Sequence, residues 1–183
     1  MLGRAIVWFI TLAVAACSSQ QQLVVQKQPR PLIPLMLGAS RQLNQQVTVQ
    51  YRDELWDLIG VSLIGSEEFR VSLLTVQGFS LMDIEYDGHK VQAQQYIDAG
   101  SQIPPQALLA DMQLIYWPLE ALQQSLPEPW RIQEKSSGGS RLRELLLDDN
   151  LYTEVRYSTD DIWQAEVYLE QKLIGYTLKI KNF

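Results

Sequence analysis

Alternation of apolar and polar residues with a period of two runs through most of this chain and sets the strongest limit on its fold. The alternating segments cover residues 47–51, 55–64, 69–77, 80–86, 89–96, 151–157, 163–169 and 174–180. Successive side chains of a strand point to opposite faces, so this period predicts half-buried antiparallel strands.

Two local signals refine this pattern. Asp87-Gly88, between two alternating segments, predicts a tight hairpin turn, because this dipeptide readily adopts the backbone that such turns need. Within residues 69–77 the apolar face switches between Leu73 and Leu74. A β-bulge, or burial of both faces, would explain the switch.

The alternation is interrupted by a helical pattern over residues 104–126. Pro104-Pro105 suits the first turn of a helix, and apolar residues then recur at helical spacing up to Ile115. Pro118 ends this helix and can begin a second short one. Strands, an inserted helical pair and strands again predict a mainly β, α+β fold in which helices cover one face of an antiparallel sheet.

The N-terminus has the features of an export signal. Arg4 precedes an apolar run from Ala5 to Ala16, which is shorter than the roughly 20 residues that cross a membrane. Residues 1–16 are therefore interpreted as a signal peptide. The run ends in Val14-Ala15-Ala16-Cys17, which resembles the bacterial lipobox, and Cys17 is the only cysteine. The alternative is a free or buried cysteine without lipid.

The lipobox resemblance implies lipidation of Cys17, with diacylglycerol on its sulfur and a fatty acyl group such as palmitate on its new amino group. Several acyl chains together anchor a protein almost permanently in a membrane. Ser18, and not aspartate, follows the cysteine. By resemblance to enterobacterial lipoproteins, this implies a location at the periplasmic face of the outer membrane.

Removal of residues 1–16 would leave 167 residues with 14 basic and 21 acidic side chains, a formal net charge of −7. That length suits one domain with its own core. Residues 17–46, rich in Gln and Pro, are expected to form the lipidated cysteine and a flexible tether, and residues 47–183 the domain. The acidic charge argues against nucleic acid partners, and a monomer is expected.

Several short motifs carry a family resemblance. They are Phe69-Arg70-Val71-Ser72-Leu73-Leu74, Val76-Gln77-Gly78-Phe79-Ser80, Tyr86-Asp87-Gly88, Ile103-Pro104-Pro105, Trp117-Pro118-Leu119 and Tyr176-Thr177-Leu178-Lys179-Ile180-Lys181-Asn182-Phe183. With the order of elements, they resemble the outer-membrane lipoprotein receptor LolB and the LolA/LolB-like group. The chain is also similar to a family of uncharacterised bacterial lipoproteins often found with genes for aryl polyene lipid production, which implies lipid handling.

The LolB-like resemblance implies a curved antiparallel half-barrel closed by a short helical lid, with a cavity for acyl chains between them. The residues expected to line this cavity are Trp56, Phe69, Met82, Ile84, Tyr116, Trp117, Val155, Val167 and Leu178. Aromatic and Met side chains suit adaptable apolar ligands. The alternative is a closed core, in which each large side chain contributes about 1.5–3 kcal/mol to stability.

The resemblance also implies an exposed apolar residue on the turn at residues 76–80, which would touch the membrane during lipid delivery. Phe79 is the first candidate and Val76 the second. The LolB group tends to have Pro-Leu-Gly where this chain has Val76-Gln77-Gly78, so the leucine of that pattern is absent here. The alternative is that Phe79 packs inward.

Residues suited to catalysis are scarce. His89 is the only histidine and falls beside the predicted hairpin turn, so a catalytic triad or a histidine metal site is not expected. The acidic pairs Glu67-Glu68, Asp148-Asp149 and Asp160-Asp161 fall at strand ends, where they suit solvated turns. Residues 136–140 lack the lysine of a phosphate-binding loop. No enzymatic activity, metal or cofactor is therefore expected.

Together these features predict a membrane-anchored lipoprotein that binds a lipid or lipidated client in an apolar cavity and delivers it to the outer membrane. The alternative is a structural or adaptor lipoprotein that binds a partner protein in an envelope assembly. An enclosed cavity would favour the carrier. Tight packing beneath residues 104–126, with an exposed apolar patch elsewhere, would favour the adaptor.

Overall fold

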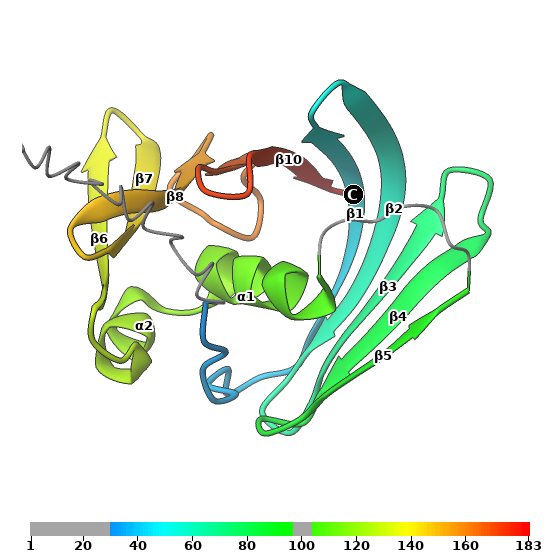
Figure 1. Cartoon of the computed structure of the whole chain (residues 1–183), viewed down its shortest axis with the longest axis horizontal. Coiled ribbons are helices and arrows are strands. Elements are labelled where there is room, and N and C mark those ends of the chain that lie inside the picture. Colours follow the sequence, from blue (N-terminus) through cyan, green and yellow to red (C-terminus); the bar gives the residue numbers. More distant parts are fainter. Residues whose placement is uncertain (1–29, 97–103) are drawn as a thin grey trace, which may run out of the picture.

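The computed structural model describes residues 30–96 and 104–183, which form one ten-stranded antiparallel sheet (Figure 1). In chain order the strands are β1 (Arg41–Tyr51), β2 (Glu54–Ile64), β3 (Phe69–Thr75), β4 (Ser80–Tyr86), β5 (Val91–Gln95), β6 (Trp130–Ser137), β7 (Ser140–Leu147), β8 (Asn150–Tyr157), β9 (Val167–Gln171) and β10 (Tyr176–Asn182). Their order across the sheet is β5-β4-β3-β2-β1-β10-β9-β8-β7-β6. The first and last strands therefore meet in the middle of the sheet.

The sheet curves around helix α1 (Pro105–Tyr116), which lies in its hollow, and α2 (Leu119–Ser125) lies near β6 (Figure 1). Pro105 lies in the first turn of α1, and Pro118 separates the two helices. The predicted mainly β fold, an antiparallel sheet with a helical pair, is confirmed. The sheet is open, with β5 and β6 at its edges. Neither described helix is long and apolar enough to span a bilayer.

The N-terminal part of the domain extends into the stretch expected to be a tether. Strand β1 begins at Arg41, and Ile33 is buried against the core. Leu43 and Gln45 continue the inward alternation of β1, and Gln45 is buried because its amide donates a hydrogen bond to the Tyr116 hydroxyl at 2.7 Å. The start of β1 was not recognised from the sequence, because the polar Gln45 occupies an inward position where the pattern calls for an apolar residue. The expected signal peptide, Cys17 and residues 18–29 lie outside the described residues.

The structure also tests the predicted bulge in residues 69–77 and the predicted turn at Asp87-Gly88. The register of β3 and β4 shifts between Leu73 and Leu74, so a bulge explains the switch of the apolar face. Asp87 stabilises the β4–β5 turn, where its carboxylate accepts hydrogen bonds from the backbone of His89 and Lys90 at 2.8 and 2.7 Å. Strands β6 and β7 lie outside the alternating segments. Charged outward residues obscure the short apolar pattern of β6, and the buried Arg143 interrupts that of β7.

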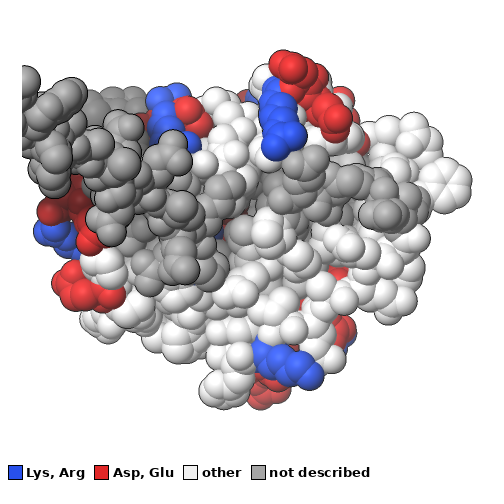
Figure 2. Space-filling view, viewed as in Figure 1, with Lys and Arg blue, Asp and Glu red and all other residues white. Residues whose placement is uncertain are grey.

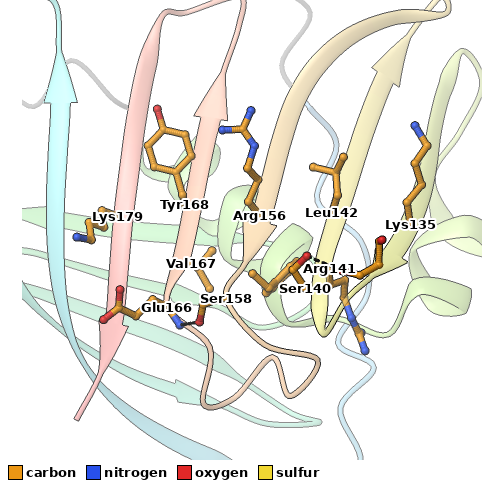
Figure 3. Close-up of a pocket in the computed structure, with 12 residues that line it drawn as sticks. Lys135, Ser140, Arg141, Leu142, Arg156, Ser158, Glu166, Val167, Tyr168 and Lys179 are labelled. Atoms are coloured by element: carbon orange, nitrogen blue, oxygen red, sulfur yellow. Dashed lines mark hydrogen bonds between the residues drawn. The ribbon is translucent and has the colours of Figure 1, made fainter.

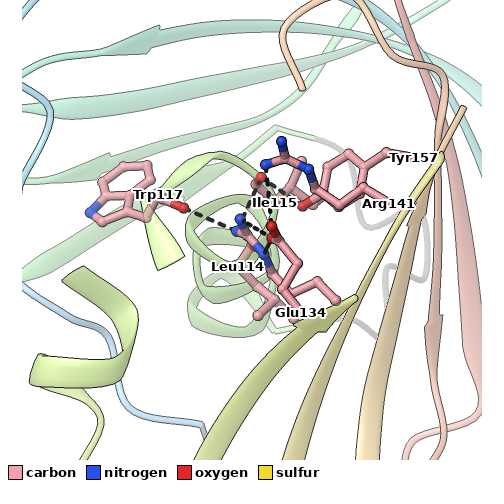
Figure 4. A network of polar contacts seen from close by, with 7 residues as sticks. Leu114, Ile115, Trp117, Glu134, Arg141 and Tyr157 are labelled. Carbon is pink, nitrogen blue, oxygen red and sulfur yellow. Dashed lines mark hydrogen bonds and ion pairs between the residues drawn. The ribbon is translucent and has the colours of Figure 1, made fainter. Parts of the chain in front are cut away.

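Burial of α1 brings the polar end of a helix into an apolar interior. The Arg143 guanidinium donates hydrogen bonds to the backbone carbonyls of Leu114 at 2.6 Å and Trp117 at 3.0 Å (Figure 4). It also forms an ion pair with Glu134 at 2.7 Å. The Tyr157 hydroxyl donates to the carbonyl of Ile115 at 2.8 Å. Strand side chains thus satisfy the free carbonyls at the end of α1, which would otherwise be costly to bury.

We predict that Arg143→Leu lowers the free energy of unfolding by about 3–5 kcal/mol, because the buried carbonyls of Leu114 and Trp117 lose their charged donor and Glu134 keeps only its longer ion pair with Arg141. Urea unfolding followed by circular dichroism measures this change. The matched control is Arg131→Leu, since Arg131 pairs with Asp149 on the exposed surface and should cost less than about 1 kcal/mol. Equal losses in the two variants would contradict a special role for Arg143.

Candidate functional site

The residues expected to line a cavity converge on the concave face of the sheet. Trp56 is half-buried and packs against this cluster. The other members are buried in the same core, namely Phe69, Met82, Ile84, Tyr116, Trp117, Val155, Val167 and Leu178. The sequence pattern therefore selected one contiguous apolar surface that spans both halves of the sheet and α1.

These side chains pack closely against one another. The rings of Phe69 and Trp117 lie 5.3 Å apart between centroids, and Tyr116 stacks on Trp163 at 5.1 Å. Burial raises the pKa of Tyr116 to about 12. Between the N-terminal segment, α1, α2 and Leu145 there is a cavity of only about 10 Å³, about the space of one water molecule. The packing here is tight, as the adaptor alternative expects.

Residues 30–37, which we call the strap, fasten α1 from the solvent side. The Arg30 guanidinium donates to the Asp111 carboxylate at 2.7 Å, and both groups are buried. The Gln113 side chain brackets Ile33, accepting from its backbone N–H at 3.0 Å and donating to its carbonyl at 2.8 Å. The strap thus replaces solvent for two polar side chains on a buried helix.

Asp111 is a carboxylate in a buried, electrostatically perturbed environment. Burial raises the pKa of its carboxyl, and the Arg30 guanidinium and the Tyr176 hydroxyl, which donates to it, partly offset this rise. Burial likewise raises the pKa of Tyr176. Neither Arg30 Nη1 nor Gln171 Nε2, both buried nearby, has a hydrogen-bond partner in the described part of the chain. Hydrogen bonds therefore satisfy this small polar region only in part.

We predict that Asp111→Asn releases the strap, because the Arg30 charge loses its buried partner and can regain hydration by leaving the helix. Hydrogen–deuterium exchange at the Ile33 amide should become at least tenfold faster. Glu120→Gln is the matched control, since Glu120 is an exposed carboxylate on α2. Unchanged exchange at Ile33 in Asp111→Asn would show that the ion pair does not hold the strap.

The turn between β3 and β4 presents both candidate membrane-contacting residues to solvent. Phe79 is 66% exposed and Val76 54% exposed. The turn is ordered by hydrogen bonds from the Thr75 N–H to the Phe79 carbonyl and from the Gly78 N–H to the Thr75 carbonyl, each 2.9 Å long. Gly78 has a φ of +88°, which favours glycine. Phe79 does not pack inward.

Further exposed apolar residues lie at the same end of the strands. Tyr51 pairs with both Glu54 and Tyr176, and Leu58 pairs with Thr75, so the β1–β2, β9–β10 and β3–β4 turns all lie at this end. We call this end of the sheet the apolar rim and define it by Leu55, Val76, Phe79 and Leu173. Figure 2 shows that the surface over the β3–β4 turn, at the right, is formed largely by uncharged residues.

Sequence reasoning missed the polar residues that organise this site. Arg30, Asp111, Gln113 and Arg143 are all buried, although their residue types are usually exposed. A signal was present: Asp111 and Gln113 interrupt an apolar helix, and Arg143 falls in the inward register of β7 two residues before Leu145. Polar residues at core positions of a periodic pattern indicate partners that the pattern itself does not identify.

Groups suited to chemistry are dispersed. His89 is exposed in the β4–β5 turn, and Asp148 and Asp149 are exposed in the β7–β8 turn. Backbone hydrogen bonds lower the pKa of Asp87, as expected for a carboxylate that caps a turn. Within residues 30–96 and 104–183, no three His, Cys, Asp or Glu side chains are grouped so that they could hold a metal ion.

Residues 42–183 match the family described as "Protein of unknown function (DUF3261)". The chain belongs to this family. No curated protein matches it. The family match covers β1 through β10, so the sheet, the buried helix α1 and the apolar rim all lie within the family's boundaries.

Proposed function

We propose that this chain is a membrane-anchored lipoprotein that binds a lipid or a lipidated client and delivers it to the outer membrane without catalysing a reaction. The observation that carries the proposal is the apolar rim, above all Phe79 and Val76 on a well-ordered turn. Exposing a large aromatic side chain forgoes about 1.5–3 kcal/mol of burial. Contact with a bilayer would recover that free energy.

In this proposal the acyl chain binds where α1 now packs. Burial of a sixteen-carbon chain is worth about 12 kcal/mol at roughly 0.8 kcal/mol per methylene. The large buried side chains of α1 contribute about 8–15 kcal/mol on the same scale, namely Leu109, Met112, Leu114, Ile115 and Tyr116. Because the two terms are similar, an acyl chain can compete with the helix for the sheet. Binding would therefore require α1 and the strap to move.

Lipid on Cys17 would hold the domain at the periplasmic face of the outer membrane. Twelve residues separate Cys17 from Arg30, and an extended chain of that length spans at most roughly 45 Å. The domain could therefore turn its apolar rim toward the bilayer in which it is anchored. The lipid anchor would then strengthen contact between the rim and the bilayer, because a tethered domain meets the bilayer at a high effective concentration.

A second candidate function rests on the tight packing beneath α1. If the core stays closed, the same fold would act as an adaptor whose apolar rim binds a partner protein in an envelope assembly. The two candidates make opposite predictions for lipid uptake, and the apolar rim serves either of them.

We predict that Phe79→Ser weakens binding of the chain lacking residues 1–17 to phosphatidylethanolamine–phosphatidylglycerol vesicles by about tenfold, because the rim loses its largest apolar group. Vesicle co-sedimentation measures the change. Phe183→Ser is the matched control, since Phe183 is 73% exposed but lies beside the start of β1, away from the rim. Equal losses in both variants would contradict a specific role for the rim.

Native mass spectrometry tests the carrier against the adaptor. We predict that the chain lacking residues 1–17 takes up an acyl lipid and that Asp111→Asn takes up more because the strap is released. A folded Phe69→Asp should take up none, because it places a charge on the sheet face that the acyl chain would occupy. Glu120→Gln should behave as the wild type. If neither the wild type nor Asp111→Asn binds lipids or lipidated peptides, the carrier is excluded and the adaptor is favoured.

A further inference from the structure

The outer face of the sheet, opposite α1, carries a groove that the proposed function does not use. It has a volume of about 790 Å³ and lies across β6–β10 (Figure 3). Five of its side chains form one row across neighbouring strands: Lys135, Leu142, Arg156, Tyr168 and Lys179. Because strand residues alternate between faces, this row points away from the core.

The groove carries several basic side chains although the protein is acidic. The row contributes three cations, and the acidic residue of the lining, Glu166, is paired with Lys181 at 3.2 Å. Arg141 also lines the groove, but its side chain turns away from the row and its guanidinium lies 3.3 Å from Glu134 on the inner side. Glu144 and Glu154 in the neighbouring row of the same face pair with Lys135 and Arg156. The positive charge that favours an anionic ligand is therefore chiefly that of Lys179.

The cations of the row are available for a ligand to different degrees. Lys135 lies 2.9 Å from Glu144, and Arg156 pairs with Glu154 but keeps more than half of its side chain exposed. No ion pair is found for Lys179 in the described part of the chain. Lys179 is therefore the principal free charge of the groove.

We propose that this groove binds a phosphorylated polyol, either a free sugar phosphate or the phosphorylated headgroup of a lipid. Arg156 and Lys179 flank Tyr168 in register, so their backbones lie about 10 Å apart, and their long side chains can reach one phosphate above the ring. The Arg156 guanidinium already lies 5.7 Å from the Tyr168 ring centre. The Ser140 and Ser158 hydroxyls line the adjoining floor, where they suit polyol hydroxyls.

The size of the groove fits this ligand class. Pockets for small molecules usually occupy about 300–1,000 Å³, far more than inorganic phosphate alone needs. The site lies on the face opposite the proposed acyl site, so it does not depend on the carrier function.

The test is isothermal titration calorimetry of the full chain in a non-ionic maltoside detergent. The probes are glucose 6-phosphate, glucose and inorganic phosphate, and mixed micelles that contain either phosphatidylglycerol or uncharged diacylglycerol. We expect glucose 6-phosphate or the phosphatidylglycerol micelles to bind, and added salt to weaken binding. Lys179→Gln and Arg156→Gln should each weaken it about tenfold. Lys90→Gln, at an exposed lysine in the β4–β5 turn, should leave it unchanged.

Each outcome decides the proposal. Binding of glucose 6-phosphate with this mutational pattern identifies a free phosphorylated polyol, and binding of phosphatidylglycerol alone with the same pattern identifies a lipid headgroup. Equal affinity for glucose and glucose 6-phosphate, or for phosphatidylglycerol and diacylglycerol, overturns the phosphate assignment. Inorganic phosphate that binds as tightly as glucose 6-phosphate overturns the polyol assignment. Absence of binding by every probe, or an equal effect of Lys90→Gln and Lys179→Gln, overturns the site.

Discussion

The burial of α1 in the hollow of the sheet is the interaction on which the rest of this structure depends. An open, curved antiparallel sheet exposes an apolar concave face, and α1 covers it with Leu109, Ile115 and Tyr116. A buried helix end carries carbonyls that need donors. Arg143 supplies them from β7, and its own charge needs Glu134. The packing of α1 against the sheet thus explains why Arg143 and Glu134 are paired in an otherwise apolar interior.

The strap satisfies buried polar side chains on the other side of α1. Asp111 and Gln113 would leave buried polar groups unsatisfied if residues 30–37 were removed. Residues 30–37 are therefore a structural part of the cover over the concave face. They contact the helix that would have to move for an acyl chain to enter in the proposed function.

The molecule separates three surfaces by physical character. The concave face is apolar and is covered by α1. The apolar rim is exposed at the turns at one end of the strands. The groove with basic side chains lies on the outer face of β6–β10. A lipid-handling protein needs such a separation, because the acyl chain, the bilayer and a polar headgroup require different environments. An adaptor would need only the rim.

The sequence by itself determined the elements and their faces. Period-two alternation identified most strands, Pro104-Pro105 and Pro118 delimited the helices, and the apolar pattern selected residues that meet in one core, because periodicity reports burial locally. Tertiary structure alone decided that Gln45, Asp111 and Arg143 are buried, since each depends on a partner 29 to 81 residues away. It also decided that Phe79 points outward and that Arg156, Tyr168 and Lys179 form one row, because strand register is a pairing between distant segments.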